Sequence, residues 1–336
     1  MANNKKLLYE ISIIRPVVIL LLVVLHSFCI YKGSWSYPEG IDHVLVYDLF
    51  AKYITGFRIE TIAFVAGYVF AFQSITLSKK HDFTPFAYKK FKRLIIPGLI
   101  FSLLYYFCFK FDSKSFGQLG WFMDLTNGFG HLWFLPMLFW CFIAIWCIDR
   151  FNLSSRTLFI ILAILSIFKM PNMIFGFTKV FHFTFYCYLG YVVYKHKQEL
   201  LSKLSRTWYI VFFWALYSLL GLVQLFVRQY FKPYLEESIA LLIACSGIMA
   251  LYLLVSKFTE KPGFTPPKWV IDSSKLCYGV YIFRQFILIY LLYHTSLPQI
   301  TGKYLLPWIA LAITLPLSII MTKLSLKTKI GRFLMG

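Results

Sequence analysis

The stretch Arg15–His26, RPVVILLLVVLH, sets nine consecutive apolar residues between a proline and a histidine, with an arginine in front. A run this apolar is typical of a membrane-spanning helix, whose side chains face hydrocarbon while its backbone bonds to itself. Ionisable groups inside such a run cost free energy and therefore point to function. The stretch predicts a first membrane helix that also carries chemistry.

The composition of the whole chain fits a membrane protein. It is 59% hydrophobic and only 14% charged, against about 25% charged in soluble domains. The formal net charge of +20 would suit a nucleic-acid partner. However, the lysines and arginines gather in short gaps between apolar runs and form no single basic stripe with interleaved aromatics. We therefore expect a multi-pass protein in the lipid bilayer, with no nucleic-acid partner.

Ten apolar runs predict an all-α polytopic membrane bundle of about ten transmembrane helices. With the N-terminus placed inside, 22 of the 34 lysines and arginines fall in inner segments and 10 in outer ones. This bias follows the positive-inside rule and puts both termini in the cytoplasm. We expect one integral-membrane domain over residues 1–336 without a fused soluble domain, and an interfacial or re-entrant piece at 44–57. The expected spans are 12–31, 58–77, 94–111, 132–148, 156–169, 178–194, 207–227, 238–256, 275–294 and 303–322.

Several kinds of site have no signal in the sequence. All seven cysteines lie in apolar runs and none forms a CxxC pair, which argues against a disulfide framework or a zinc site. The sequence has no P-loop, HExxH, GxSxG or Asp-rich metal pattern. We therefore expect no metal, no ATP-driven transport and no serine-hydrolase chemistry.

Arg15 and His26 are eleven residues apart, which on a helix is about 20° past three full turns and about 16 Å of rise. One face of the first helix would thus carry a cation at its inner end and a proton acceptor in its outer half. Pro16 suits the first position of that helix. Two simpler interpretations stay open: Arg15 as a positive-inside anchor, and His26 as a hydrogen-bonded packing residue.

The third predicted span starts with a second basic group. Lys90 and Arg93 are three residues apart, so they share a helix face at the cytoplasmic mouth. Together with Arg15 they offer several positive charges to the phosphates of a nucleotide-like ligand. The alternative for these residues is again the positive-inside signal.

Further candidates lie toward the outer side. Glu60 and His131 should lie at roughly the depth of His26, where a carboxylate near an imidazole can fix its tautomer. Arg58 and Arg284 add two cations within spans. Trp133 is either an interfacial aromatic or part of a wall on which a sugar stacks.

These residues lie in segments that resemble the membrane-bound acyltransferase 3 family, the integral-membrane O-acyltransferases of bacterial surface glycans. The similar segments run in order from residue 9 to about 286 and are YEISIIRPVVILLLVVLH, FVAGYVF, KKFKRLIIP, GHLWFLP, FYCYLGYVVYK and YGVYIFRQF. Three positions depart from the family pattern. Ser12 stands where an acidic residue is common, Lys90 replaces the first arginine of an Arg-x-x-Arg pair, and Arg284 replaces a histidine.

The resemblance implies transfer of an acyl group, most often acetyl, from cytoplasmic acyl-CoA to a sugar hydroxyl, in the bacterial cytoplasmic membrane. His26 would be the general base, and Arg15, Lys90 and Arg93 would bind the acyl-CoA co-substrate, with no permanently bound cofactor. The other partner would be a glycan or lipid-linked sugar acceptor. A glycan exporter or flippase and a succinyl-CoA enzyme remain alternatives, and the sequence fixes neither the acceptor nor the oligomeric state. Supporting roles fall to Glu10, Arg58, Glu60, His131, Trp133 and Arg284, the last as an oxyanion stabiliser.

Overall fold

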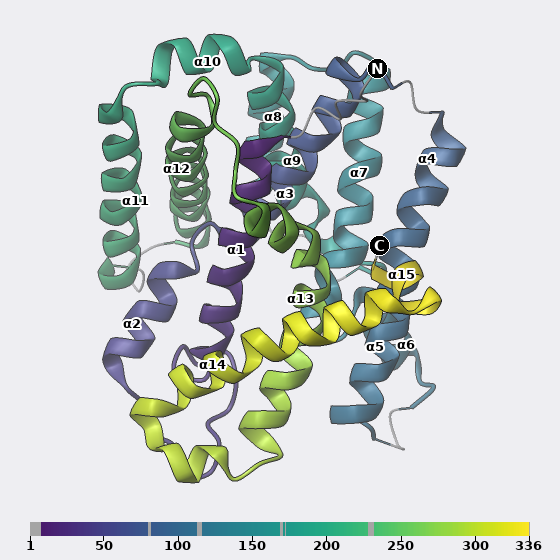
Figure 1. The fold of residues 1–336 in the computed structure, drawn as a ribbon, viewed down its shortest axis with the longest axis vertical. Helices are drawn as coiled ribbons and strands as arrows, with labels where there is room; N and C mark the ends of the chain where they lie inside the picture. The colour runs from purple at the N-terminus through teal and green to yellow at the C-terminus, as the bar shows by residue number, and fades with distance from the viewer. Residues whose placement is uncertain are drawn as a thin grey trace.

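The computed structural model describes residues 8–79, 82–112, 116–168, 171, 173–227 and 232–335. This part of the chain is mainly helical and contains no strand, which confirms the predicted all-α polytopic bundle (Figure 1). Within the described residues, eight helical runs are long and apolar enough to cross a membrane. They are Tyr9–Ser27, Leu45–Thr76, Phe83–Phe109, Gly130–Arg150, Thr207–Phe226, Pro233–Thr259, Lys268–Tyr293 and Leu297–Lys327.

The individual helices divide some of these runs. In chain order they are α1 (Tyr9–Ser27), α2 (Leu45–Ile54), α3 (Arg58–Ala71), η1 (Phe72–Thr76), α4 (Phe83–Lys90), η2 (Phe91–Ile95), α5 (Ile96–Phe109), α6 (Leu119–Asn127), η3 (Gly130–Trp133), α7 (Phe134–Arg150), α8 (Arg156–Ile167), η4 (Phe177–Lys179), α9 (Val180–Lys195), α10 (Lys197–Leu204), α11 (Thr207–Val227), α12 (Pro233–Thr259), α13 (Lys268–Tyr293), α14 (Leu297–Lys327) and α15 (Lys329–Met335).

Two predicted spans correspond to shorter helices. The segment 156–169 falls on α8, which has 12 residues, and 178–194 falls on α9, which has 16; Lys169 lies outside the described residues. A straight span of the bilayer core takes about 20 residues. The count of ten spans and the cytoplasmic position of both termini therefore stay predictions. The segment 44–57 contains a separate ten-residue helix, α2.

The first helix begins earlier than Pro16 suggested. It starts at Tyr9 and carries Pro16 in its interior. Proline has no backbone N–H, so the carbonyl one turn earlier, on Ser12, has no amide hydrogen to accept. The hydroxyl of Ser12 itself donates to the Leu8 carbonyl at 3.1 Å. Arg15 and His26 nevertheless lie on one continuous helix, as predicted.

The third predicted span begins 11 residues early, because α4, η2 and α5 form one column from Phe83. Within it, η2 is a π-helix that carries Arg93, and such segments are rare and often functional. The ammonium of Lys90 lies 3.4 Å from the ring centre of Phe142 on α7. This cation–π contact stabilises the half-buried lysine within the helical column.

Helices α3 and α9 touch through their backbones. A Cβ atom on Gly67 would lie 1.7 Å from the carbonyl oxygen of Cys187, and one on Gly190 would lie 2.0 Å from that of Phe64. Both distances are far below any van der Waals contact. Small residues at helix interfaces in membranes permit this close approach, so the glycines fix α3, which begins with Arg58, against α9.

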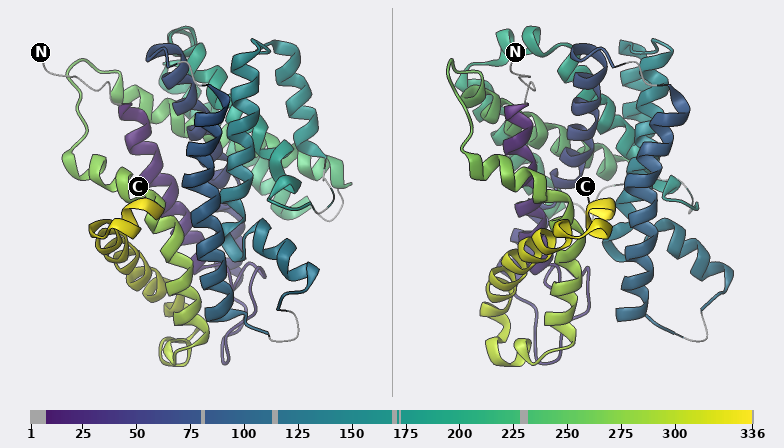
Figure 2. Two further views of the ribbon diagram at one scale, coloured as in Figure 1. Left: turned by 90° about the vertical axis from the view of Figure 1, so that its right-hand side faces the viewer. Right: turned by 45° about the vertical axis from the view of Figure 1, so that its right-hand side comes forward.

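The C-terminal helices lie across the bundle. Both views in Figure 2 show α14, in yellow, running obliquely to the column of α4 and α5. Helix α14 is interrupted at Gly302, where φ is 65°, and contains Pro307 and Pro316. Helix α15 then reaches η2 and α5, with the Lys92 ammonium 4.8 Å from the centre of the Phe333 ring.

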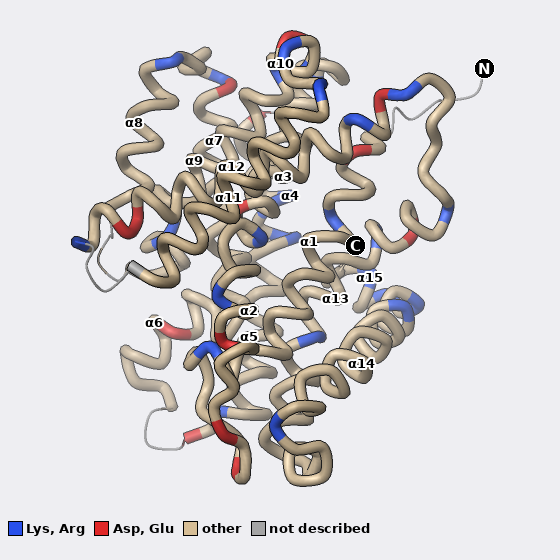
Figure 3. The backbone as a smooth tube through the Cα atoms, turned by 90° about the vertical axis from the view of Figure 1, so that its left-hand side faces the viewer, with Lys and Arg blue, Asp and Glu red and all other residues tan. Residues whose placement is uncertain are grey.

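An ion-pair network connects several helices at the end of the molecule where α10 lies. Blue and red segments, which mark basic and acidic residues, cluster at this end in Figure 3. The ammonium of Lys197 lies 2.8 Å from a Glu10 carboxylate oxygen and 2.6 Å from one of Glu260. The Tyr68 hydroxyl donates to Glu10 at 2.6 Å. Burial alone lowers the pKa of Lys197, but its carboxylate partners, Glu10 first, raise that pKa above the ordinary range. Glu10, predicted as a supporting site residue, thus joins α1, α3 and α10.

Candidate active site

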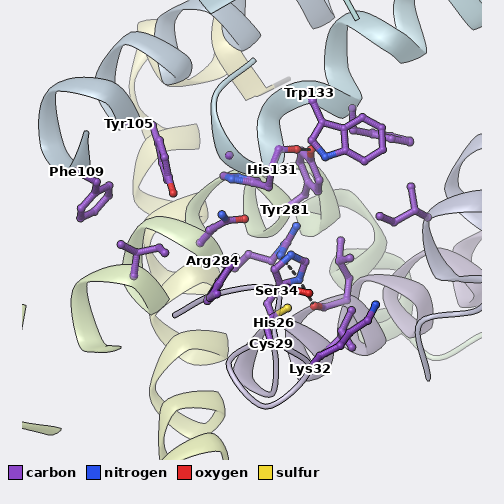
Figure 4. Close-up of a pocket in the computed structure, with 18 of the residues that line it drawn as sticks. His26, Cys29, Lys32, Ser34, Tyr105, Phe109, His131, Trp133, Tyr281 and Arg284 are labelled. Carbon is purple, nitrogen blue, oxygen red and sulfur yellow. Dashed lines mark hydrogen bonds between the residues drawn. The ribbon is translucent and has the colours of Figure 1, made fainter. Parts of the chain in front are cut away.

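A cavity of about 670 Å³ lies where the end of α1 meets the start of α3, the end of α5, η3 and α13. Four residues singled out from the sequence as ionisable groups in spans line it: His26, Arg58, His131 and Arg284. Figure 4 shows His26, His131 and Arg284 converging from three different elements on one space. The fold therefore brings together residues that are up to 258 positions apart in the chain.

His26 lies in the last turn of α1. Its Nδ1 is 2.7 Å from the Leu22 carbonyl oxygen and 2.7 Å from Nη1 of Arg284. One ring nitrogen cannot donate to the carbonyl and accept from the guanidinium at once, so the two contacts belong to different tautomers. When Nδ1–H bonds to Leu22, Nε2 keeps its lone pair. No described residue forms a hydrogen bond to Nε2, so this tautomer offers a proton acceptor to the cavity.

Arg284 is almost fully buried, with 1% of its surface exposed. Besides the contact to His26, its guanidinium lies 5.2 Å from the ring centre of Tyr281. Its Nε has no hydrogen-bond partner in the described part of the chain. Arg284 thus places a permanent positive charge beside the imidazole of His26, and its Nε–H is available as a hydrogen-bond donor.

His131 is a second histidine that lines the cavity. Its Nε2 lies 2.9 Å from the Ile282 carbonyl and donates to it, while the Tyr281 hydroxyl donates to the backbone carbonyl of His131. The ring is therefore held by α13, with Nδ1 left without a partner among the described residues. No hydrogen bond between His131 and His26 is present in that part.

The side chains of Arg58 and Glu60 lie on different sides of α3, although the residues are only two positions apart. Arg58 lines the cavity and Glu60 does not, because neighbours at i and i+2 point to different sides of a helix. No hydrogen bond joins Glu60 to His26 in the described chain, so the arrangement in which this carboxylate orients the imidazole is absent. Trp133 does line the cavity, and the Lys179 ammonium lies 3.5 Å from its ring centre.

The predicted phosphate-binding residues form a separate basic group. Arg15, Lys90 and Arg93 lie within electrostatic range of one another, as the sequence predicted, and none of them lines the cavity. Arg15 and Arg93 are exposed and Lys90 is half-buried. The Tyr278 hydroxyl of α13 donates to the Arg93 carbonyl at 3.0 Å. This group begins eleven residues before His26 on α1, which is about 16 Å of helix rise.

A family model described as an acyltransferase domain matches residues 8–323, from the start of α1 to near the end of α14. The chain belongs to the acyltransferase 3 family. This confirms the resemblance and makes the protein a membrane acyltransferase. No curated protein and no solved structure matches the chain.

The cavity of this acyltransferase also includes residues that the sequence pattern did not single out. Lys32 and Trp35 come from the segment after α1, and the Trp35 ring centre is 5.8 Å from that of His26. Tyr105 and Gln285 also line the cavity. Gln285 had a signal, since it directly follows Arg284 in YIFRQF. Trp35 had none, because a loop has no periodicity that predicts where a side chain points.

Proposed function

We propose that this acyltransferase transfers an acetyl group from cytoplasmic acetyl-CoA to a sugar hydroxyl of a cell-surface or exported glycan, in the bacterial cytoplasmic membrane. One observation carries the proposal. The Nε2 of His26 meets no described hydrogen-bond partner and adjoins a cavity of about 670 Å³, which is large enough for a sugar ring. Family membership supplies the acyl-transfer chemistry.

The residues have distinct tasks in this reaction. Arg15, Lys90 and Arg93 hold the phosphates of CoA, and its extended arm brings the thioester to His26. The Nε2 of His26 takes the proton of the sugar hydroxyl as the hydroxyl oxygen attacks the thioester carbonyl. Arg284 stabilises the oxyanion of the tetrahedral intermediate. When the C–S bond breaks, His26 returns the proton to the leaving sulfur, so that an ester and free CoA thiol are formed.

Two other functions compete with this one. A succinyl-CoA enzyme would use the same machinery with a longer, charged acyl group. A glycan exporter or flippase would use the charged interior without thioester chemistry. The acetyl group is favoured because it is the usual donor group that the resemblance implies.

The first test is thioester turnover by purified protein in nanodiscs with acetyl-, succinyl- and butyryl-CoA. We expect His26→Ala to lose at least about 100-fold in kcat and to keep CoA binding, because only the base is removed. We expect Arg15→Ala to raise the KM for the CoA substrate. Lys303→Gln serves as the control, because Lys303 pairs with Asp42 at 3.8 Å and does not line the cavity.

Two results would contradict the proposal. Unchanged turnover in His26→Ala would remove His26 as the base. Absence of CoA binding in folded wild-type protein would favour the exporter.

A further inference from the structure

We infer that the cavity binds an anionic group of the substrate, a carboxylate or a phosphate, and that Arg58 is its anchor. The inference rests on the proposed function and adds a substrate class to it. The anion belongs either to an acidic sugar acceptor or to a dicarboxylic acyl group, and the experiment below separates these two sources.

The first argument is the charge of the cavity wall. Lys32, Arg58, Lys110 and Arg284 line the cavity, together with three imidazoles, those of His26, His131 and His294. No aspartate or glutamate of the described residues lines it. Four cations around one cavity whose described lining contains no carboxylate create a strongly positive potential, which attracts a ligand of opposite charge.

The second argument is the state of Arg58. Only 6% of this residue is exposed, and its guanidinium has no hydrogen bond or ion pair with any described residue. Its Nε is buried and without a partner. A buried cation without a partner is costly, and the five donors of arginine match a carboxylate or a phosphate in a bidentate fork. The cavity thus contains a charge-assisted binding site that no described protein group fills.

The neighbours of Arg58 strengthen this argument. Arg284, also buried, lies within electrostatic range of it, and the Nε of Arg284 is unpartnered too. Glu60 lies within electrostatic range of Arg58 as well, but no salt bridge joins the two in the described chain and Glu60 is outside the cavity lining. Two buried arginines that line one cavity, within electrostatic range of each other and without an ion pair to a described residue, are best explained by an anion that binds in the cavity.

The reaction itself does not account for both arginines. Arg284 contacts His26 and is placed to meet the transient oxyanion. The CoA phosphates are assigned to Arg15, Lys90 and Arg93, which lie outside the cavity. Arg58 has no assigned partner in the reaction steps. It is therefore available to bind a permanent negative charge on the substrate that occupies the cavity.

The acceptor test compares three probes that differ at one carbon of the sugar. Saturation-transfer NMR titrations on the full chain in nanodiscs would give Kd values for methyl β-D-glucuronide, methyl β-D-glucoside 6-phosphate and methyl β-D-glucoside. We expect an anionic probe to bind wild type about tenfold more tightly than the glucoside. Arg58→Gln should abolish the preference, Arg58→Lys should keep part of it, and Lys303→Gln should keep all of it.

The donor test measures kcat/KM for hydrolysis of succinyl-CoA and acetyl-CoA by the same variants. If the acyl group carries the anion, Arg58→Gln should lower succinyl-CoA turnover about tenfold relative to acetyl-CoA. If the acceptor carries it, the ratio of the two donors should not change. The Arg58→Lys variant keeps the test valid if Arg58→Gln does not fold.

The inference is overturned if wild type shows neither preference, including the case where no anionic probe binds, or if Arg58→Gln keeps whichever preference wild type shows. This failure is distinct from failure of the proposed function. Thioester turnover that requires His26, without any anion preference, would remove the inference alone. An anion preference that depends on Arg58, without CoA turnover, would remove the proposed reaction.

Discussion

Arg284 contacts the imidazole of His26 at 2.7 Å and lines the cavity, whereas Arg15, Lys90 and Arg93 do not line it. We expect Arg284→Gln to lower kcat about 100-fold, because it removes a preorganised cation from the developing oxyanion. The KM for acetyl-CoA should stay within about twofold, since the phosphate-binding residues are untouched. Steady-state kinetics of acetyl transfer measure both constants, and a wild-type kcat would exclude Arg284 from the reaction.

At the residue scale, the sequence predicted four ionisable cavity residues that lie within or at the edge of apolar runs, and it missed Lys32, Lys110, His294 and most of the uncharged lining. His26, Arg58, His131 and Arg284 stand out because a charge or imidazole in an apolar run is rare. Glu60 met the same criterion and yet faces away from the cavity. Depth can be estimated from position along a helix, but the direction of a side chain depends on the rotation of that helix in the bundle. Only the packed structure fixes that rotation.

At the scale of elements, the contact between α3 and α9 makes a sharp prediction. Gly67→Ala would force a methyl group into the Cys187 carbonyl, 1.7 Å from the ideal Cβ position. We expect a loss of about 3 kcal/mol or more, because overpacked sites must move backbone. Thermal unfolding in detergent measures it. Gly120→Ala is the control, because nothing lies within 4 Å of its Cβ position; equal melting temperatures for the two variants would refute the contact.

The ion pair between α1 and α10 gives a second prediction. Lys197→Met leaves the buried Glu10 carboxylate without its cation, and we expect a loss on the order of 3 kcal/mol. Lys203→Met breaks only the exposed pair with Glu199, so its effect should be below about 1 kcal/mol. Equal melting temperatures of the two variants would contradict the role of the Glu10 pair.

The pH dependence of this pair follows from the raised pKa of Lys197. A group whose pKa is higher in the folded state stabilises the fold fully below its unfolded pKa, about 10.5 for lysine. That stabilisation is lost as the pH rises through the folded-state value. The difference in melting temperature between wild type and Lys197→Met should therefore be constant from about pH 7 to about pH 9. A difference that fades within this window would show that Lys197 titrates there.

Helix positions were predictable and helix boundaries were less so. Apolar runs located every long helix, because the length of a run reflects the thickness of the bilayer. Pro16 suggested a helix start, but α1 begins at Tyr9, since a long apolar helix can tolerate one missing hydrogen bond. The π-helices at Phe72–Thr76 and Phe91–Ile95 were not predicted, because the apolar pattern of the sequence does not distinguish an i→i+5 turn from an ordinary helical turn.

At the scale of the whole molecule, the charge bias predicts which end faces the cytoplasm. Single cysteines at Glu39 and Lys203 would test it, in a background where the seven native cysteines are replaced. In intact cells we expect a membrane-impermeant maleimide to label position 39, and to label position 203 only after permeabilisation, because basic loops stay inside. The opposite pattern would invert the orientation and the proposed side of acyl-CoA entry.

The two glycines that join α3 to α9 also have a mechanical consequence. Two helices whose backbones touch cannot shift relative to each other without losing that contact. We therefore expect α3 and α9 to move as one rigid unit, which keeps Arg58 in a fixed position. Helix α14, by contrast, has a joint at Gly302 and two internal prolines. Conformational changes during turnover should therefore be concentrated in α14 and its neighbour α13. Because Arg284 lies on α13, such changes would move it toward or away from His26, while Arg58 on α3 stays in place.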